Sequence, residues 1–161
     1  MPSSREPYKT AILGGTFDCF HKGHEALIKK AAETANSMII GVTSDEMARR
    51  LKDHPVSPYR EREKELKTYL KSKGFASFTI LTIQDPYGPT LSIPNIDVIV
   101  VSQETRQRAK EINDIRRKKG LRPLKIVTIR QVLSEDGKPI TTARILKGEI
   151  DRNGKIITNI D

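Results

Sequence analysis

Cysteine, tryptophan and long apolar runs are scarce or absent in this chain. A single cysteine, Cys19, excludes an intramolecular disulfide and any cysteine-rich metal cluster. No apolar run approaches the ~20 residues needed to cross a bilayer, and the N-terminus has no apolar signal core, so a cytoplasmic protein with no membrane partner is expected. Aromatic residues make up 5% of the chain. Because single-stranded nucleic acid is usually bound by aromatic stacking, specific nucleic-acid binding is disfavoured.

Histidine is also rare, with three in the chain. His21 and His24 are close in sequence but His54 is not, so a zinc site with three or four protein ligands is disfavoured. Charge, in contrast, is abundant, since 29 basic and 20 acidic residues leave a net charge of +9. The excess indicates anionic partners, either phosphorylated small molecules or nucleic acid. Along residues 60–71 acids and bases are interspersed, which is typical of a solvated helix face.

The order of apolar segments predicts one α/β domain over all 161 residues. Residues 1–8 are expected to form a loose leader, and residues 149–161 a tail that turns at Asn153-Gly154 as in a hairpin. Five apolar strands alternate with helices, which is the pattern of a parallel sheet built from βαβ units. The expected strands are residues 10–13, 38–42, 78–83, 97–101 and 124–129. The expected helices are residues 23–35, 44–51 (capped by Thr43), 58–73 (capped by Ser57), 103–119 and 142–147.

The stretch between residues 14 and 24 carries the strongest functional pattern. The first strand runs into Gly14-Gly15, which lets the backbone turn sharply and lets an anion approach the main chain. A helix then begins near Gly23. His21 and His24 extend the buried stripe of that helix to its N-terminus, where free N–H groups and the macrodipole attract negative charge. A phosphate site is therefore predicted, with metal binding and simple helix capping as the alternative interpretations.

These residues resemble the signature of the nucleotidyltransferase superfamily, which includes cytidylyltransferases and the adenylyltransferases of coenzyme pathways. The match joins Gly-Thr-Phe-Asp to His-Lys-Gly-His in the family's order. The resemblance implies a Rossmann-like nucleotidyltransferase fold, with His21 and His24 contacting the triphosphate and stabilising the transition state. It also implies that Thr16 orients the attacking phosphate. The nucleotide-binding residues implied here are Gly15, Thr16, Phe17, His21, Gly23 and His24.

A second pattern lies at residues 140–145, which read Ile-Thr-Thr-Ala-Arg-Ile. Hydroxyls at the start of a short helix cap its free N–H groups, and the same arrangement offers donors to a triphosphate. The segment resembles the superfamily's second motif, ISSTxIR, with threonines for both serines and Leu146 where an arginine usually stands. The resemblance implies nucleotide contacts from Thr141, Thr142 and Arg144, with Arg144 supplying the missing charge.

Further segments narrow the resemblance. The loop 84–95 contains Asp-Pro-Tyr-Gly-Pro-Thr, and residues 100–105 read Val-Val-Ser-Gln-Glu-Thr. With residues 112–124, they resemble the archaeal type of phosphopantetheine adenylyltransferase and the matching domain of eukaryotic coenzyme A synthase. A loop of about a dozen residues in a compact domain is more often functional than idle. Here Tyr87 is expected to belong to a mostly apolar wall for the pantetheine arm.

Three polar side chains complete the expected site. Lys52, in competition with Arg49 and Arg50, is assigned to the phosphate of the acceptor, as a lysine in this connection implies within the superfamily. Asn113 and Arg116 share a helix face with apolar residues and so point toward the sheet. Buried polar groups need partners, which here are either nucleotide atoms or neighbouring backbone. Asn113 is assigned to the nucleotide.

The reaction implied by the resemblance is transfer of the adenylyl group of ATP to 4′-phosphopantetheine, giving dephospho-coenzyme A and pyrophosphate. Mg²⁺ is expected to arrive with ATP, because no carboxylate cluster is visible to hold it. Residues 134–139 lack the arginine turn of cytidylyltransferases, which favours ATP over CTP. A CTP-dependent relative, a nicotinamide or flavin mononucleotide adenylyltransferase, and a basic nucleic-acid-binding protein on the same fold are the alternatives. The oligomeric state is open, with a monomer among the possibilities.

Overall fold

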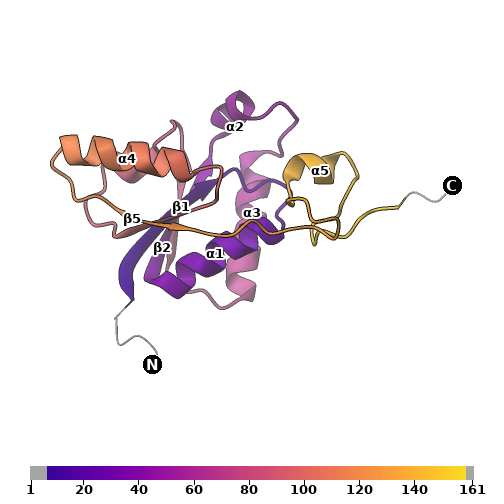
Figure 1. The fold of residues 1–161 in the computed structure, drawn as a ribbon, viewed down its shortest axis with the longest axis horizontal. Helices are drawn as coiled ribbons and strands as arrows, with labels where there is room; N and C mark the ends of the chain where they lie inside the picture. Colours follow the sequence, from indigo (N-terminus) through magenta and orange to yellow (C-terminus); the bar gives the residue numbers. More distant parts are fainter. Residues whose placement is uncertain (1–6, 159–161) are drawn as a thin grey trace.

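A computed structural model describes residues 7–158 and contains one five-stranded, wholly parallel sheet. The strand order is β3-β2-β1-β4-β5, and helices cover both faces (Figure 1). The prediction of a single α/β domain with five parallel strands is confirmed. The strands are β1 (Tyr8–Gly15), β2 (Ala35–Thr43), β3 (Phe78–Ile83), β4 (Val98–Val101) and β5 (Lys125–Thr128).

Five α-helices and one 3-10 helix connect the strands or follow them. They are α1 (Lys22–Thr34), α2 (Asp45–Leu51), α3 (Tyr59–Ser72), η1 (Gly88–Leu91), α4 (Arg106–Lys118) and α5 (Thr142–Leu146). Two predicted caps were wrong. Ser44, not Thr43, caps α2, because β2 continues through Thr43 and places that residue in the core. Pro58 occupies the N-cap position of α3, without a side-chain hydrogen bond, so Ser57 lies one residue too early to cap it.

Two apolar clusters join the helices to the sheet. One packs α1 and α3 against the first face through Leu27, Ile28, Leu66 and Leu70. The other packs α4, with Ala109 and Ile112, and the loop around η1 against the opposite face. Figure 1 shows α4 and α1 on opposite sides of the strands. None of the helices in the described range is long and apolar enough to span a membrane.

The two ends of the described range contact neighbouring segments. The leader expected at residues 1–8 falls largely outside the described residues, but Tyr8 already pairs with Ala35 in the sheet. In the described part of the tail, Ile150 and Ile156 form an antiparallel bridge. The connection 129–141 is a second long one, besides 84–95, and an antiparallel bridge between Leu133 and Pro139 closes part of it.

The strand order creates a crevice above the centre of the sheet. From β1 the chain builds β2 and β3 on one side and then crosses over to build β4 and β5 on the other. Because all strands are parallel, their carboxyl ends meet at one edge, and the connections from β1 and β4 leave in opposite directions there. Ligands of open α/β sheets bind at such a switch point.

Candidate active site

A cleft of about 570 Å³ opens at this carboxyl edge. Its walls come from the turn after β1, the start of α1, the loop after α2, η1, the start of α4 and the start of α5. All but two of the site residues predicted from the sequence line it. Those that do are Gly15, Thr16, Phe17, His21, Gly23, His24, Lys52, Tyr87, Thr141 and Thr142.

The turn after β1 is held in an unusual backbone conformation. Phe17 and Cys19 have φ angles of 54° and 47°, in the left-handed region that residues with side chains rarely adopt. The Phe17 ring is fully buried, and a Cβ on Gly15 would lie 3.3 Å from its Cε2 atom. Strain of this kind persists only where the surroundings enforce it, and it gathers at functional sites. The packed phenylalanine therefore fixes the turn that forms the floor of the cleft.

The two histidines cap α1 with their own rings. The Nδ1 atom of His21 accepts a hydrogen bond from the Gly23 N–H (3.0 Å), and Nδ1 of His24 accepts one from the His21 N–H (3.1 Å). The ring centroids stack 3.7 Å apart. A neutral imidazole carries one proton, so accepting at Nδ1 places that proton on Nε2 in both rings. Each histidine thus presents an Nε2–H donor, and both residues line the cleft.

Burial keeps both rings neutral. It lowers the pKa of His21 to about 4, and the positive charges of Arg152 and Lys52 act in the same direction. Burial also lowers the pKa of His24 well below its ordinary value, with smaller contributions from His21 and Lys52. At neutral pH the pair therefore donates hydrogen bonds without carrying positive charge. Such donors suit phosphate oxygens, but they do not neutralise them.

Position 23, between the two histidines, has no room for a side chain. A Cβ at this position would lie 2.8 Å from Cε1 and 3.0 Å from Nδ1 of His21. Any side chain would push the His21 ring out of its capping position. The glycine of the His-Lys-Gly-His sequence is thus explained by the packing of the preceding histidine.

The threonines that line the cleft differ in what their hydroxyls do. Thr141 is the N-cap of α5 and accepts a hydrogen bond from the Arg144 N–H (3.2 Å), so its own O–H is left without an acceptor among the described residues. Thr142 instead donates its O–H to the carbonyl oxygen of Asp18 (3.0 Å), which ties α5 to the turn after β1. The Thr16 hydroxyl accepts from that of Thr43 (3.2 Å) at the end of β2.

Arg144 does not line the cleft, although the sequence assigned it to the nucleotide. Its guanidinium forms ion pairs with Asp136 (2.6 Å) and Glu149 (3.1 Å) and donates to the Ser134 hydroxyl and the Pro139 carbonyl. These contacts brace the 134–139 turn against α5. Hydrogen bonds from Ser134, Lys138 and this guanidinium lower the pKa of Asp136 and keep it ionised.

Asn113 is the other residue that does not line the cleft. Its Nδ2 donates to the Leu124 carbonyl (2.8 Å), and its Oδ1 accepts from the Leu124 N–H (2.7 Å). Both polar atoms of the amide are thus bonded to backbone at the entry to β5, and the structure does not place this side chain at the predicted nucleotide site. Arg116 is likewise buried and bonded to backbone, donating to the carbonyls of Thr90 and Ile93. The sequence left two kinds of partner possible, nucleotide atoms or neighbouring backbone. In the structure both side chains form hydrogen bonds with backbone.

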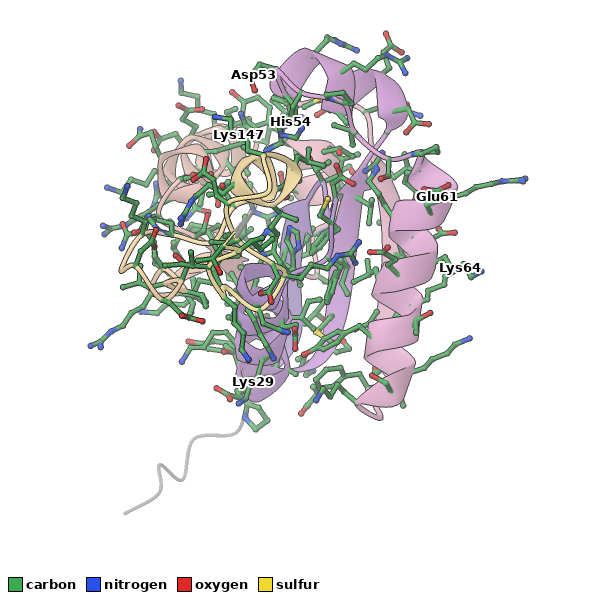
Figure 2. All side chains as sticks on the ribbon, turned by 90° about the vertical axis from the view of Figure 1, so that its right-hand side faces the viewer. Lys29, Asp53, His54, Glu61, Lys64 and Lys147 are labelled. Atoms are coloured by element: carbon green, nitrogen blue, oxygen red, sulfur yellow. The ribbon has the colours of Figure 1, made fainter. Side chains whose placement is uncertain are left out.

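The sequence did not reveal the role of Arg62, which bonds the backbone beneath the cleft residue Thr16. Only 1% of it is exposed, although residues 60–71 were expected to form a solvated face. Its guanidinium donates to the carbonyls of Thr16 (2.9 Å), Thr43 (2.8 Å) and Ser57 (2.8 Å). A signal existed, because Arg62 continues the four-residue spacing of the buried Leu66 and Leu70. On the same helix, Glu61 and Lys64 point away from the molecule (Figure 2).

Asp18 bonds backbone N–H groups, and the Cys19 thiol is partly buried. Oδ1 of Asp18 accepts from the backbone N–H groups of Cys19 (3.0 Å) and Ser57 (3.3 Å). Burial raises the pKa of the Cys19 thiol, so the thiol stays protonated near neutral pH and is a poor nucleophile. Among the described residues, no three histidine, cysteine or acidic side chains are grouped to hold a metal ion.

Known proteins match this chain along most of its length. Residues 12–148 match the Cytidylyltransferase-like family. The chain is 44% identical over 156 residues to the phosphopantetheine adenylyltransferase of Methanothermobacter thermautotrophicus, covering 97% of this chain and 94% of that protein. This chain belongs to the phosphopantetheine adenylyltransferase family. A second member, from Methanosarcina mazei, is 46% identical over 89% of this chain and 94% of its own length.

The family also includes longer proteins. A bifunctional phosphopantetheine adenylyltransferase/NTP phosphatase from Thermoplasma volcanium is 47% identical over 89% of this chain, which spans 44% of that protein. Among solved structures, a protein of unknown function from Archaeoglobus fulgidus is 41% identical, with a TM-score of 0.69 over 75% of this chain and 88% of its own. A tyrosyl-tRNA synthetase from the same organism has a TM-score of 0.65 over 85% of this chain and 59% of its own at 11% identity, which shows a shared fold only.

Proposed function

We propose that this chain reversibly transfers the adenylyl group of ATP to 4′-phosphopantetheine, giving dephospho-coenzyme A and pyrophosphate. The names of its family members support this substrate pair. The observation that carries the chemistry is the pair of neutral histidines at the start of α1, each left with an Nε2–H donor at the cleft. Neutral donors at a helix N-terminus favour phosphate oxygens and stabilise the charge that builds on them during the reaction.

The proposed reaction is a direct displacement. An oxygen of the acceptor phosphate attacks the α-phosphorus of ATP, and the bond from that phosphorus to the bridging oxygen of pyrophosphate breaks on the opposite side. His24 and His21 donate hydrogen bonds to oxygens of the reacting phosphates as their charge increases. Catalysis then rests on positioning and on charge stabilisation, without a covalent intermediate. The protonated thiol of Cys19 is consistent with this course.

The two substrates are assigned to opposite sides of the α1 start. Lys52 follows α2 on the β2 side of β1, and Tyr87 lies between β3 and η1; we place the acceptor along these two connections. The loop with Tyr87 lies against an apolar cluster and supplies the wall for the pantetheine arm. Thr16, at the centre, orients the attacking phosphate. Thr141 and Thr142 face the pyrophosphate end from α5.

A divalent cation fits this site only as a companion of the triphosphate. Nucleotidyltransferases of this kind generally use ATP with a divalent metal, and Mg²⁺ is the ion we propose here. The donors at the start of α1 suit anions. Asp18, Asp53 and Glu104 also line the cleft, but no three acidic, histidine or cysteine side chains of the described residues are grouped to hold a cation. The cation would therefore be held by phosphate oxygens and water, and it would supply charge neutralisation of the leaving pyrophosphate.

A competition assay tests the proposal. The purified protein is incubated with ATP and CTP together, Mg²⁺, and a panel of acceptors that includes 4′-phosphopantetheine, nicotinamide mononucleotide and flavin mononucleotide. We expect dephospho-coenzyme A as the main product by mass, with stoichiometric pyrophosphate. A CDP-linked product or an adenylylated mononucleotide would assign the chain to another branch of the superfamily. Sub-micromolar binding of oligonucleotides near physiological salt, with no transfer, would favour the nucleic-acid-binding alternative.

A further inference from the structure

The triphosphate end of the cleft needs cations that the two motifs do not supply. A nucleoside triphosphate carries several negative charges at neutral pH, and the two histidines that face it are neutral. Arg144, the expected cation, is taken up by Asp136 and Glu149 outside the cleft. Leu146, where the family's motif usually has an arginine, carries no charge. A divalent cation bound to the triphosphate would neutralise part of this charge, and the rest is left to other cations that line the cleft.

Three lysine or arginine side chains of the described chain line the cleft, namely Lys52, Arg108 and Arg130. None of them forms an ion pair with another described residue. Asp18, Asp53 and Glu104 also line the cleft, but none of these acids forms an ion pair with the three cations. Three unpaired cations in one concave site favour a polyanionic ligand.

The sheet order separates these cations into two groups. Lys52 follows α2 and belongs to the β2 side of β1. Arg108 lies in the first turn of α4, which follows β4, and Arg130 comes two residues after the end of β5 at Thr128. Since β4 and β5 lie on the other side of β1, both arginines line the cleft from segments on the side opposite Lys52.

We infer that Arg108 and Arg130 bind the polyphosphate of the nucleotide from the β4–β5 side of the cleft, in the place of the arginine that Leu146 replaces. The 129–141 connection runs from Arg130 directly to Thr141, so the same segment brings a guanidinium and a free hydroxyl to the pyrophosphate end. A guanidinium pairs with phosphate oxygens through two parallel hydrogen bonds, which a lysine cannot reproduce. The inference deepens the proposed function and rests on it only for the identity of ATP.

The test is direct binding in the absence of acceptor. Calorimetry on wild type, Arg108→Gln and Arg130→Gln would give the dissociation constants of ATP, inorganic pyrophosphate and adenosine. We expect the affinity for ATP and pyrophosphate to fall about tenfold for the half-buried Arg108 and about threefold for the exposed Arg130. Adenosine affinity should stay within twofold of wild type in both. The control is Arg106→Gln, an exposed arginine of the same turn that does not line the cleft.

Two outcomes would overturn the inference. Equal losses of ATP and adenosine affinity would mean that the arginines hold the nucleoside or the fold. An equal loss of ATP affinity in Arg106→Gln would reduce the effect to the general charge of the surface. If wild type binds ATP but forms no dephospho-coenzyme A, the proposed function fails while the ATP-to-adenosine comparison still decides the role of the arginines.

Discussion

Among the helix starts that line the cleft, those of α1 and α5 are built in different ways. α1 is 13 residues long, buries Leu27, Ile28 and Ala31, and is capped by a histidine three residues from its partner. α5 is five residues long and has no buried residue. Its position depends on contacts with distant segments, above all the bond from Thr142 to the carbonyl of Asp18. Donors at α1 are therefore set by local sequence, whereas donors at α5 depend on the rest of the fold.

The largest effect is expected at α1. His24→Ala removes one Nε2–H donor and should lower kcat by roughly 10²–10³, as loss of one transition-state donor typically does. The helix is anchored by its apolar stripe, so the variant should still fold. Single-turnover kinetics with ATP and 4′-phosphopantetheine, beside a circular-dichroism melting curve, measure both properties. A folded variant with unchanged turnover would remove His24 from the mechanism.

The histidine pair also predicts how stability depends on pH. Unfolded histidine binds its proton near pH 6.5, whereas folded His21 binds one only near pH 4. Between these values the unfolded state binds more protons, so stability is fully present above pH 6.5 and falls as the pH drops toward 4. The contribution of His21 is about 3 kcal/mol across this window. Urea unfolding at several pH values measures it.

His21→Asn is the matched control, because asparagine keeps a good N-cap acceptor while removing the titration. The variant should lose much of the slope between pH 6.5 and 4.5 that wild type shows. An unchanged slope would mean that other groups cause the acid sensitivity, and that the folded His21 takes up its proton at an ordinary pH.

Features of the fold that depend on neighbours in the chain were predicted from the sequence, whereas those that depend on distant contacts were not. The strand Phe78–Ile83 was predicted to the residue, and the histidine stripe of α1 was read correctly from its spacing, because both depend on neighbours in the chain. The cap of α2 was misplaced by one residue, since pairing with β3 extends β2 through Thr43. Local patterns thus fix where elements lie, and tertiary pairing fixes their ends.

Arginine partners were the main failure of sequence reasoning. Arg144 sits in a recognisable motif, but the turn at Asp136 folds back and takes up its charge. Arg62 looked like part of a solvated face, yet three backbone carbonyls and Asp45 gather around it. A long, flexible cation reaches partners that no helical period specifies. Only the spacing of Arg62 with the buried Leu66 and Leu70 hinted at burial.

Replacing Arg144 tests whether α5 is held in place by contacts with distant segments. Arg144→Met should lower the melting temperature by about 5 °C, because the 134–139 turn and Glu149 lose their common partner. KM for ATP should change less than threefold. Lys147→Met, an exposed change at the C-cap of α5 (Figure 2), is the control and should leave both values near wild type. A large rise in KM for ATP without a loss of stability would restore Arg144 as a nucleotide ligand.

Replacing Thr141 should lower both the stability of the protein and its affinity for ATP. Thr141→Ala removes the cap of α5, which costs about 1 kcal/mol of stability, and it also removes the one hydroxyl of the pair that is free to donate into the cleft. We expect KM for ATP to rise about fivefold, since a hydrogen bond to a charged phosphate is lost. Thr141→Ser should recover most of both properties. Loss of stability alone would leave Thr141 as a cap and nothing more.

The smallest kinetic effect is expected at the adjacent residue. The O–H of Thr142 is already donated to the carbonyl of Asp18, so it reaches a phosphate only by giving up that bond. Thr142→Ala should therefore cost about 1 kcal/mol of stability, the net worth of an ordinary hydrogen bond, and should change KM for ATP less than twofold. Parallel melting curves and ATP titrations of both alanine variants make the comparison. If Thr142→Ala raises KM as much as Thr141→Ala does, the bond to Asp18 breaks when nucleotide binds, and the two hydroxyls act as equals.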